Sequence, residues 1–248
     1  SPSLTIKVSN GDFNYRVSYA RGFRSPTLKE LYMNWQHLTL FTIYGDKNLK
    51  AETSNYFALS TEYVNISKRL SITGSLSYNS IKNKIGGIWT ANQTEYHYKN
   101  GYEYSVFNAE LLARWKILKS LQVKGGYAYT HIPEDESITL LSTTSPHNLT
   151  AQLDYNLTKG WYELNANIAL KFIGKKKVRE LDIDNNNFYI MEYPNYSLVN
   201  ININQRFKRN YSLSIGVKNL FSYVAPIHSF YTTPTVGQRF FIAIGYDF

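Results

Sequence analysis

The sequence predicts an all-β fold, an antiparallel up-and-down transmembrane β-barrel, on the basis of three observations. About eleven stretches of the 248 residues alternate apolar and polar side chains, which is the period-2 pattern of a strand with two different faces. Short turns and long irregular connections alternate between these stretches, as they do when antiparallel neighbours place every tight turn at one end. No run approaches the roughly 20 apolar residues of a membrane helix.

Composition favours strands throughout the chain. Tyr (22), Phe (13) and Trp (4) are abundant, and aromatic residues suit strands better than helices. The lack of cysteine excludes a disulfide framework, a thiolate metal site and a cysteine nucleophile. The formal charge of +9 comes from scattered Lys and Arg residues that match no nucleic-acid recognition pattern. We therefore expect solvated loops and turns that can face anionic lipid head groups, and no nucleic-acid partner.

The first two predicted strands form a hairpin, and a long loop follows them. Apolar and polar residues alternate over 4–9 and 13–20, and Asn10-Gly11-Asp12 between them favours a tight turn because these residues tolerate positive φ. Residues 21–50 are the longest stretch without simple alternation. We predict that this loop is the functional segment and that the strands are its scaffold.

The remaining strands repeat this alternation, with one face of Leu, Ile, Val, Ala and aromatic residues and another of Asn, Thr, Ser and charged residues. They are predicted at residues 56–63, 70–78, 107–117, 121–130, 148–157, 162–172, 199–207, 211–217 and 239–248. Short turns lie near residues 65–68, 118–120, 159–160 and 208–210. Long connections are predicted at 82–103, 132–146, 175–194 and 221–236, and the IGGIWT segment of the first should extend a hairpin beyond the main sheet.

The two-faced strands suit a barrel wall with lipid outside and a wet lumen inside. Several aromatic residues fall near the short turns, where a ring can keep a polar edge in the lipid head groups: Trp115, Trp161, Tyr162, Phe207, Tyr211 and Phe248. A β-sandwich also alternates in polarity, but usually has Greek-key crossings and shorter strands. The first and last strands both begin on the long-loop side, so the count is odd. Because bacterial single-chain barrels have even counts, we expect part of a larger barrel.

The long loop contains Phe23-Arg24-Ser25-Pro26 and, a few residues later, Glu30-Leu31-Tyr32. With these two elements the loop resembles the TonB-dependent outer-membrane receptors, which carry an aromatic-Arg-Ala/Ser-Pro box followed by a Glu-hydrophobic-Tyr element. Asn48-Leu49 matches the end of the Asn-Pro-Asn/Asp-Leu box, in which Lys47 stands in place of the proline. The run from Gly216 to Phe221 and the C-terminal aromatic residue extend the resemblance.

The resemblance implies a barrel of about 22 strands, of which residues 1–248 would be the C-terminal part, without the plug domain, the TonB box or the first half of the wall. It implies a Gram-negative outer-membrane receptor powered by the TonB-ExbB-ExbD system through the plug. Further implied partners are outer-membrane lipid, lipopolysaccharide and a surface lipoprotein or haem-carrier protein. The chain alone should neither gate nor transport.

The ligand implied by the resemblance is haem, because the family's haem branch carries a His after the Glu-hydrophobic-Tyr element, where this chain has His37. A neutral imidazole can bind haem iron, while Trp35, Phe41 and Tyr44 would cover the porphyrin. His97 would be a second ligand or an aromatic contact. Haem would be a transported ligand, not a resident cofactor. His37 can also be an ordinary loop residue, and cobalamin and a ferric siderophore are the rival ligands.

The boxes themselves are predicted to be architectural. Pro26 fixes φ, and Arg24 and Glu30 should pair at the base of the loop. The other residues of this motif are Phe23, Ser25, Tyr32, Asn48 and Leu49.

Other sites have little support in the sequence. His131, His147 and His228 show no metal-ligand spacing, and residues 182–187 lack the closing Glu of a calcium loop because Tyr193 stands in its place. No Gly-x-Ser-x-Gly elbow, phosphate loop or dinucleotide fingerprint occurs, so we expect no enzyme. The alternatives of a different class are a passive porin-like channel and a soluble β-sandwich binder.

Overall fold

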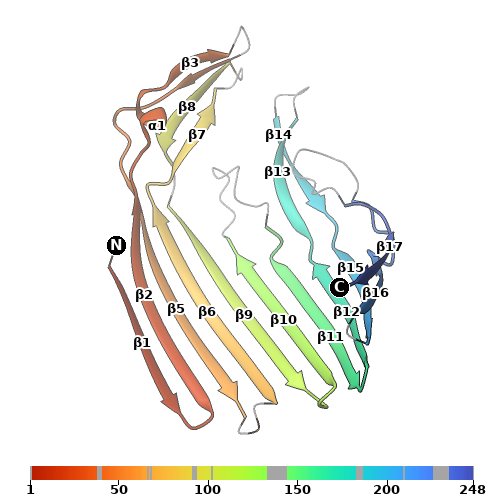
Figure 1. Ribbon diagram of the computed structural model, residues 1–248. Coiled ribbons are helices and arrows are strands. Elements are labelled where there is room, and N and C mark those ends of the chain that lie inside the picture. Colours follow the sequence, from red (N-terminus) through yellow and green to blue (C-terminus); the bar gives the residue numbers. More distant parts are fainter. Residues whose placement is uncertain are drawn as a thin grey trace.

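An eleven-stranded antiparallel sheet forms the wall of the molecule (Figure 1). The computed structural model describes residues 2–37, 41–65, 67, 69–90, 94–101, 103–132, 144–182, 187–208, 210–225 and 235–247. The strands follow the order β1-β2-β5-β6-β9-β10-β11-β12-β15-β16-β17. Their bounds are β1 Ser3–Asn10, β2 Phe13–Arg24, β5 Glu52–Val64, β6 Leu70–Lys82, β9 Tyr104–Lys116, β10 Leu121–His131, β11 His147–Lys159, β12 Tyr162–Ile173, β15 Tyr196–Phe207, β16 Tyr211–Lys218 and β17 Arg239–Tyr246.

The predicted count of eleven strands and their up-and-down order are confirmed. Every wall strand pairs antiparallel with its neighbours along the chain, so the Greek-key crossings of a sandwich do not occur among them. The tight turns lie together at one end of the sheet and the long connections at the other (Figure 1). Gly11 (φ 57°) and Gly160 (φ 58°) occupy two of these turns in the left-handed region, which glycine enters without steric cost.

The apolar side chains on one face of the wall stay exposed, as expected for alternating strands whose apolar face meets lipid. Large apolar side chains stay exposed on it along the whole sheet, for example Ile6, Val17, Leu59, Leu111 and Ile244. Three of the predicted aromatic residues meet near one short turn: the Trp161 ring lies 6.2 Å from that of Phe207, and the Tyr162 ring lies 5.2 Å from that of Phe207. Phe248 lies outside the described residues.

Buried side chains in the described part of the chain gather near the long connections instead of between two layers. They are Leu49, Glu52, Ile85, Ser145, Val178, Tyr193, Val217 and Asn219. Asn219 shows why. Its side chain donates to the carbonyls of Tyr223 (2.7 Å) and Val236 (3.0 Å) and accepts from the Tyr223 N–H (3.0 Å), which fixes both ends of the last long connection.

The long connections contain structure that the sequence did not predict. Residues 21–50 carry the helix α1 (Leu28–Tyr32) and the strands β3 (Asn34–His37) and β4 (Phe41–Tyr44), and β2 extends into this stretch as far as Arg24. The connection 82–103 carries β7 (Ile85–Trp89) and β8 (Glu95–Asn100), and 175–194 carries the hairpin of β13 (Lys176–Asp182) and β14 (Asn187–Tyr193). The expectation of irregular loops was therefore wrong at 21–50 and 175–194. At 82–103 the hairpin expected from the IGGIWT segment is confirmed.

No helix in the described ranges is long and apolar enough to span a membrane.

Candidate functional site

Two long connections fold together into one small sheet beyond the ends of β2, β5 and β6 (Figure 1). This four-stranded sheet, here called the mouth sheet, has the order β3-β4-β8-β7. The β3–β4 and β7–β8 pairs are antiparallel hairpins, and β4 joins β8 in parallel through pairs such as Ile43↔Tyr96. Residues about 50 positions apart in the chain thus share one surface.

The entry to the first connection is a short capped helix. The Thr27 side chain accepts from the Glu30 N–H (3.3 Å), and the Glu30 carboxylate accepts from the Thr27 N–H (2.7 Å). This reciprocal capping box satisfies donors at the start of α1. Pro26, immediately before it, restricts the backbone to an extended entry. The helix then holds the return strand, because the N–H groups of Gly45 and Asp46 donate to the carbonyls of Met33 and Glu30 (2.6 and 2.9 Å).

The ion pair expected between Arg24 and Glu30 is present, and it is part of a larger junction. Arg24 donates to Glu30 through both Nη atoms (3.0 to 3.1 Å) and to Glu52 Oε1 through Nη2 (2.8 Å). The same Glu52 oxygen accepts from the Ile85 N–H (2.8 Å) and lies 3.5 Å from Lys84 Nζ. Glu52 is 8% exposed. One buried carboxylate therefore joins the first connection to the second.

Electrostatics at this junction favour the charged carboxylate of Glu30. Partial burial alone would raise the pKa of Glu30, but hydrogen bonds from Arg24 and from the backbone and hydroxyl of Thr27 outweigh it and hold that pKa below its usual value. Asn100 adds a second link: it accepts from the Lys50 N–H (2.6 Å) and donates to the carbonyls of Lys50 and Asn83 (2.9 Å each).

The rest of the family-like motif lies around this junction. Leu49 is buried, and the Asn48 N–H donates to Asp46 Oδ1 at 2.8 Å. Lys47, in the place of the expected proline, lies over the Tyr32 ring at 5.7 Å. Phe23 is exposed on the apolar face of β2, and Ser25 is exposed beside it.

One face of the mouth sheet is a row of aromatic rings. Because residues paired across strands share a face, the register places Trp35, Ile43, Tyr96 and Trp89 together. Ring contacts continue from strand to strand with centroid distances of 6.2 Å (Trp35–Phe41), 5.3 Å (Phe41–Trp89), 5.0 Å (Trp89–Tyr96) and 5.3 Å (Tyr96–Tyr98). All four pairs are edge-to-face, the arrangement that the ring quadrupole favours.

This aromatic row is half open to solvent. Trp35 is 43% exposed and Trp89 is 47% exposed. Burial raises the pKa of Tyr96, with Tyr98 and Glu30 adding to the effect. A side chain at Gly87 would collide with the Tyr96 ring, since an added Cβ would sit within about 2 Å of it. Glycine at this position is therefore what lets the tyrosine lie over β7.

The opposite face of the mouth sheet is polar. Tyr44 pairs with His97 in the register, and their rings stack with centroids 4.9 Å apart at an interplanar angle of 19°. His97 Nε2 lies 2.8 Å from Glu95 Oε2. The imidazole thus already has a carboxylate partner on one ring nitrogen and an aromatic ring against its plane.

The structure therefore divides the predicted ligand residues between two faces. Trp35 and Phe41 lie in the aromatic row, whereas Tyr44 and His97 lie on the polar face. The backbone of His37 pairs with Phe41 at the end of the β3–β4 hairpin, while its side chain lies outside what the structure describes. Sequence reasoning missed Trp89, Tyr96 and Tyr98. The alternation of Glu95-Tyr96-His97-Tyr98 was the available signal.

Several other residues were considered as metal ligands from the sequence. Within the described ranges, no three His, Asp or Glu residues lie close enough to hold a metal ion. His131 and His147 lie at the ends of wall strands, and His228 and most of the rejected calcium loop are outside the described residues. Lys175 pairs with Glu192 at 2.9 Å, and Lys176 lies 4.8 Å from the Tyr193 ring centroid.

Comparisons with known proteins agree with this architecture. Residues 1–220 match the family model described as "TonB dependent receptor-like, beta-barrel". The fold is similar to that of the siderophore receptor PirA from Acinetobacter baumannii, with a TM-score of 0.79 and 18% identity over 100% of this chain and 41% of that one. A mutant of the ferric enterobactin receptor PfeA from Pseudomonas aeruginosa gives 0.77 and 20% over 100% and 40%.

The FrpB iron transporter from Neisseria meningitidis gives a TM-score of 0.75 and 16% identity, over 99% of this chain and 38% of that one. At these identities the similarity concerns the fold alone. The chain spans about two fifths of the length of the solved structures that it matches. No curated protein sequence matches it.

Proposed function

Because the chain belongs to the TonB-dependent receptor β-barrel family, as the match over residues 1–220 shows, we propose that it forms the C-terminal part of the barrel of an outer-membrane receptor that imports an iron chelate. The predicted fold class, about eleven antiparallel strands of a larger up-and-down barrel, is confirmed. The proposed ligand is a ferric siderophore with aromatic chelating groups. Uptake would use the TonB-ExbB-ExbD system and the plug of the complete receptor.

The aromatic row of the mouth sheet carries the choice of ligand. It offers Trp35, Phe41, Trp89, Tyr96 and Tyr98 as one connected surface at the loop end of the wall. Edge-to-face contacts hold these rings in place before any ligand arrives, so little side-chain entropy remains to be lost on binding. Tryptophan and tyrosine are also among the side chains most enriched where a few residues dominate the binding energy. Fold relatives named as siderophore receptors are consistent with this ligand class.

Haem is the second candidate, and the position of His37 is the observation that favours it. Its backbone lies opposite Phe41, beside the aromatic row, where an imidazole could reach a porphyrin iron. His97 supports haem less well than expected, because its ring stacks on Tyr44 and contacts Glu95 on the polar face. No feature of the described residues favours cobalamin. A passive porin-like channel would have no need for a preassembled row of rings above the wall.

Fluorescence titration of the intact receptor tests the ligand. Trp35 and Trp89 lie in the proposed contact surface, so a ferric siderophore of the aromatic class should quench tryptophan emission with saturation. Replacing Trp89→Ala should weaken binding about tenfold or more, since a contact tryptophan is commonly worth at least about 1.4 kcal/mol. The matched control is Trp161→Ala. This tryptophan is 63% exposed near a short turn at the far end of the wall and should leave the affinity unchanged.

The possible results separate the candidates. Saturable binding of hemin that is lost in His37→Ala, without binding of a ferric siderophore, would replace the ligand assignment with haem. Equal affinities of the wild type and Trp89→Ala for the siderophore would remove the aromatic row from the mechanism.

A further inference from the structure

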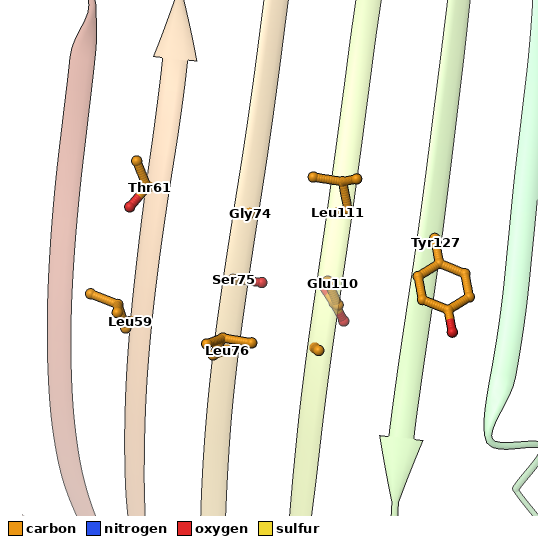
Figure 2. Close-up of a pocket in the computed structure, with 9 residues that line it drawn as sticks. Leu59, Thr61, Gly74, Ser75, Leu76, Glu110, Leu111 and Tyr127 are labelled. Atoms are coloured by element: carbon orange, nitrogen blue, oxygen red, sulfur yellow. The ribbon is translucent and has the colours of Figure 1, made fainter.

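The two faces of the wall offer a ligand different chemistry. Leu59, Leu76 and Leu111 line a hollow on the apolar face (Figure 2), which is the face that meets lipid. The opposite, polar face is the one that lines the lumen of a barrel. Asn167 and Asn202 pair on it across β12 and β15, and every second residue along these strands shares it. A ligand that has entered the lumen therefore meets the wall through this polar face.

Positive charge gathers on the polar face at the loop ends of β12, β16 and β17. Lys171 lies on this face four residues after Asn167. Lys218 lies on it two residues after Gly216 and pairs directly with Arg239. All three cations are exposed, and none forms an ion pair within the described part of the chain. Because like charges directly opposite each other destabilise a sheet, the Lys218–Arg239 pair is unfavourable unless an anion lies between them.

The sequence around this pair carries no negative charge. Between Glu192 and Asp247 the chain contains no Asp or Glu residue. The other end of β15 differs, since Arg206 stands opposite Glu163 there. A surface lined by one sign of charge raises the local concentration of ligands of the opposite sign. The loop end of β15, β16 and β17 is therefore suited to an anion.

Two tyrosines add hydrogen-bond donors beside these charges. Tyr196 lies on the polar face at the start of β15, opposite Ile173, and its ring stacks flat on that of Tyr223, with centroids 4.5 Å apart at an interplanar angle of 5°. The Asn219 side chain fixes this arrangement, because it accepts from the Tyr223 N–H (3.0 Å) and donates to the Tyr223 carbonyl (2.7 Å). The Asn219 N–H donates in turn to the Asn200 side chain on β15 (2.9 Å).

The hydroxyl groups of this stacked pair are available to a ligand. Both rings are half-buried, and neither hydroxyl makes a hydrogen bond to any residue that the structure describes. A tyrosine hydroxyl usually finds a partner when its ring is buried. The two O–H groups can therefore donate to the oxygen atoms of a bound molecule.

We propose that this surface, here called the basic rim (Lys171, Tyr196, Lys218, Tyr223 and Arg239), selects the iron-loaded form of the chelator over its iron-free form. The proposal rests on the proposed function, in which the chelating groups are aromatic. Phenolic hydroxyls titrate near about pH 10, so an iron-free catechol chelator keeps these protons at neutral pH. Iron binds the deprotonated oxygens and releases the protons. In a tris-catechol complex the negative oxygens outnumber the charge of Fe³⁺, and the loaded complex is an anion.

The aromatic row and the basic rim would therefore read different properties of one ligand. The aromatic row contacts ring faces, which the loaded and the iron-free forms share. The basic rim contacts oxygen atoms, whose charge differs between the two forms, and hydrogen bonds to charged oxygens are about twice as strong as those to neutral ones. The mouth sheet stands above β2, β5 and β6, whereas the basic rim lies at the loop ends of β12, β15, β16 and β17 on the other side of the molecule (Figure 1).

Isothermal titration calorimetry of the intact receptor tests this selection, with a tris-catechol chelator and its ferric complex as the two ligands. The wild type should bind the ferric complex about tenfold or more tightly than the iron-free chelator, and added salt should weaken the ferric complex alone. Lys218→Gln/Arg239→Gln and Tyr196→Phe/Tyr223→Phe should each lower the affinity for the ferric complex about tenfold. Neither variant should change the affinity for the iron-free chelator.

The matched control is Arg206→Gln/Lys208→Gln, which removes the same charge at the opposite end of β15 and should bind as the wild type does. Trp89→Ala should weaken both ligands, because the aromatic row contacts both. Heat-modifiable migration in gels should show that every variant is folded. A wild type that binds neither ligand would overturn the proposed function and this proposal with it. Equal wild-type affinities for the two ligands, or equal effects of Lys218→Gln/Arg239→Gln and the control, would overturn this proposal alone.

Discussion

Replacing Glu52→Gln should loosen both connections of the mouth sheet at once. The carboxylate of Glu52 accepts from Arg24 and from the Ile85 N–H at 2.8 Å each and lies 3.5 Å from Lys84 Nζ. Glutamine keeps the size of the side chain and one carbonyl acceptor but removes the charge from a position that is 8% exposed. Arg24 then retains Glu30 as its anionic partner.

The magnitude follows from these contacts. A hydrogen bond to a charged group contributes about 1.5 to 3 kcal/mol, and the Arg24 side chain is 40% exposed, so solvent screening reduces its share. Losing the charge should therefore cost about 2 kcal/mol of local stability, which corresponds to an increase of about 30-fold in the population of the opened state.

Hydrogen exchange measured by mass spectrometry on the intact receptor reads this population directly. Peptides from residues 25–50 and from 83–101 should both exchange about 30-fold faster, because Glu52 joins the two connections. The control is Glu62→Gln on the same strand, where the carboxylate accepts from Asn14 at 3.3 Å. Unchanged exchange in Glu52→Gln, or faster exchange in the first connection alone, would refute the claim that the two connections open together.

Two further predictions concern the entry to the first connection. Gly45→Ala places a Cβ 2.7 Å from the Leu31 carbonyl carbon and 2.8 Å from the Glu30 carbonyl oxygen, so overpacking of about 1 to 3 kcal/mol should make residues 25–50 sensitive to protease. Gly86→Ala is the control, because a Cβ there meets nothing within 4 Å and should leave protease resistance unchanged. Equal resistance of the two variants would contradict the packing argument. The second prediction concerns pH. Burial alone would raise the pKa of Glu30, but hydrogen bonds from Arg24 and Thr27 hold that pKa below 4.5. The stabilisation from the charged carboxylate is therefore present above pH 4.5 and is lost as the pH falls through the lowered pKa. Protease resistance should fall with it, and Glu30→Gln should flatten this pH profile.

The wall could be predicted from the sequence because local pattern determines it. Strands of 8 to 13 residues give several periods of alternation, and turns such as Asn10-Gly11-Asp12 mark their ends. The order of the strands then follows from the alternation of short and long connections. Each of these signals is contained in about twenty neighbouring residues.

The mouth sheet could not be predicted in the same way. Its strands have 4 to 6 residues, which is too short for a clear period, and Gly86-Gly87 interrupts the pattern in β7. The parallel pairing of β4 with β8 joins distant segments, and no local signal announces it. Glu52 lies only three positions after Leu49 of the family-like motif, but its partner Ile85 lies 33 positions later in the chain.

The predicted ligand residues illustrate the same limit. Trp35 and Phe41 were selected because they are aromatic residues in the long loop, and they do share a face. His97 was selected for its residue type, yet register and stacking place it with Tyr44 on the polar face. Residue type showed which side chains could bind an iron chelate. Their distribution between two faces needed the strand register.

The uptake of radioactive iron by cells that express the complete receptor tests the central claim most directly. Iron supplied as a ferric siderophore with aromatic chelating groups should accumulate in these cells, and uptake should stop when TonB is deleted and fall strongly in Trp89→Ala. Iron uptake that continues without TonB, or none from any such siderophore while hemin is taken up, would contradict the account.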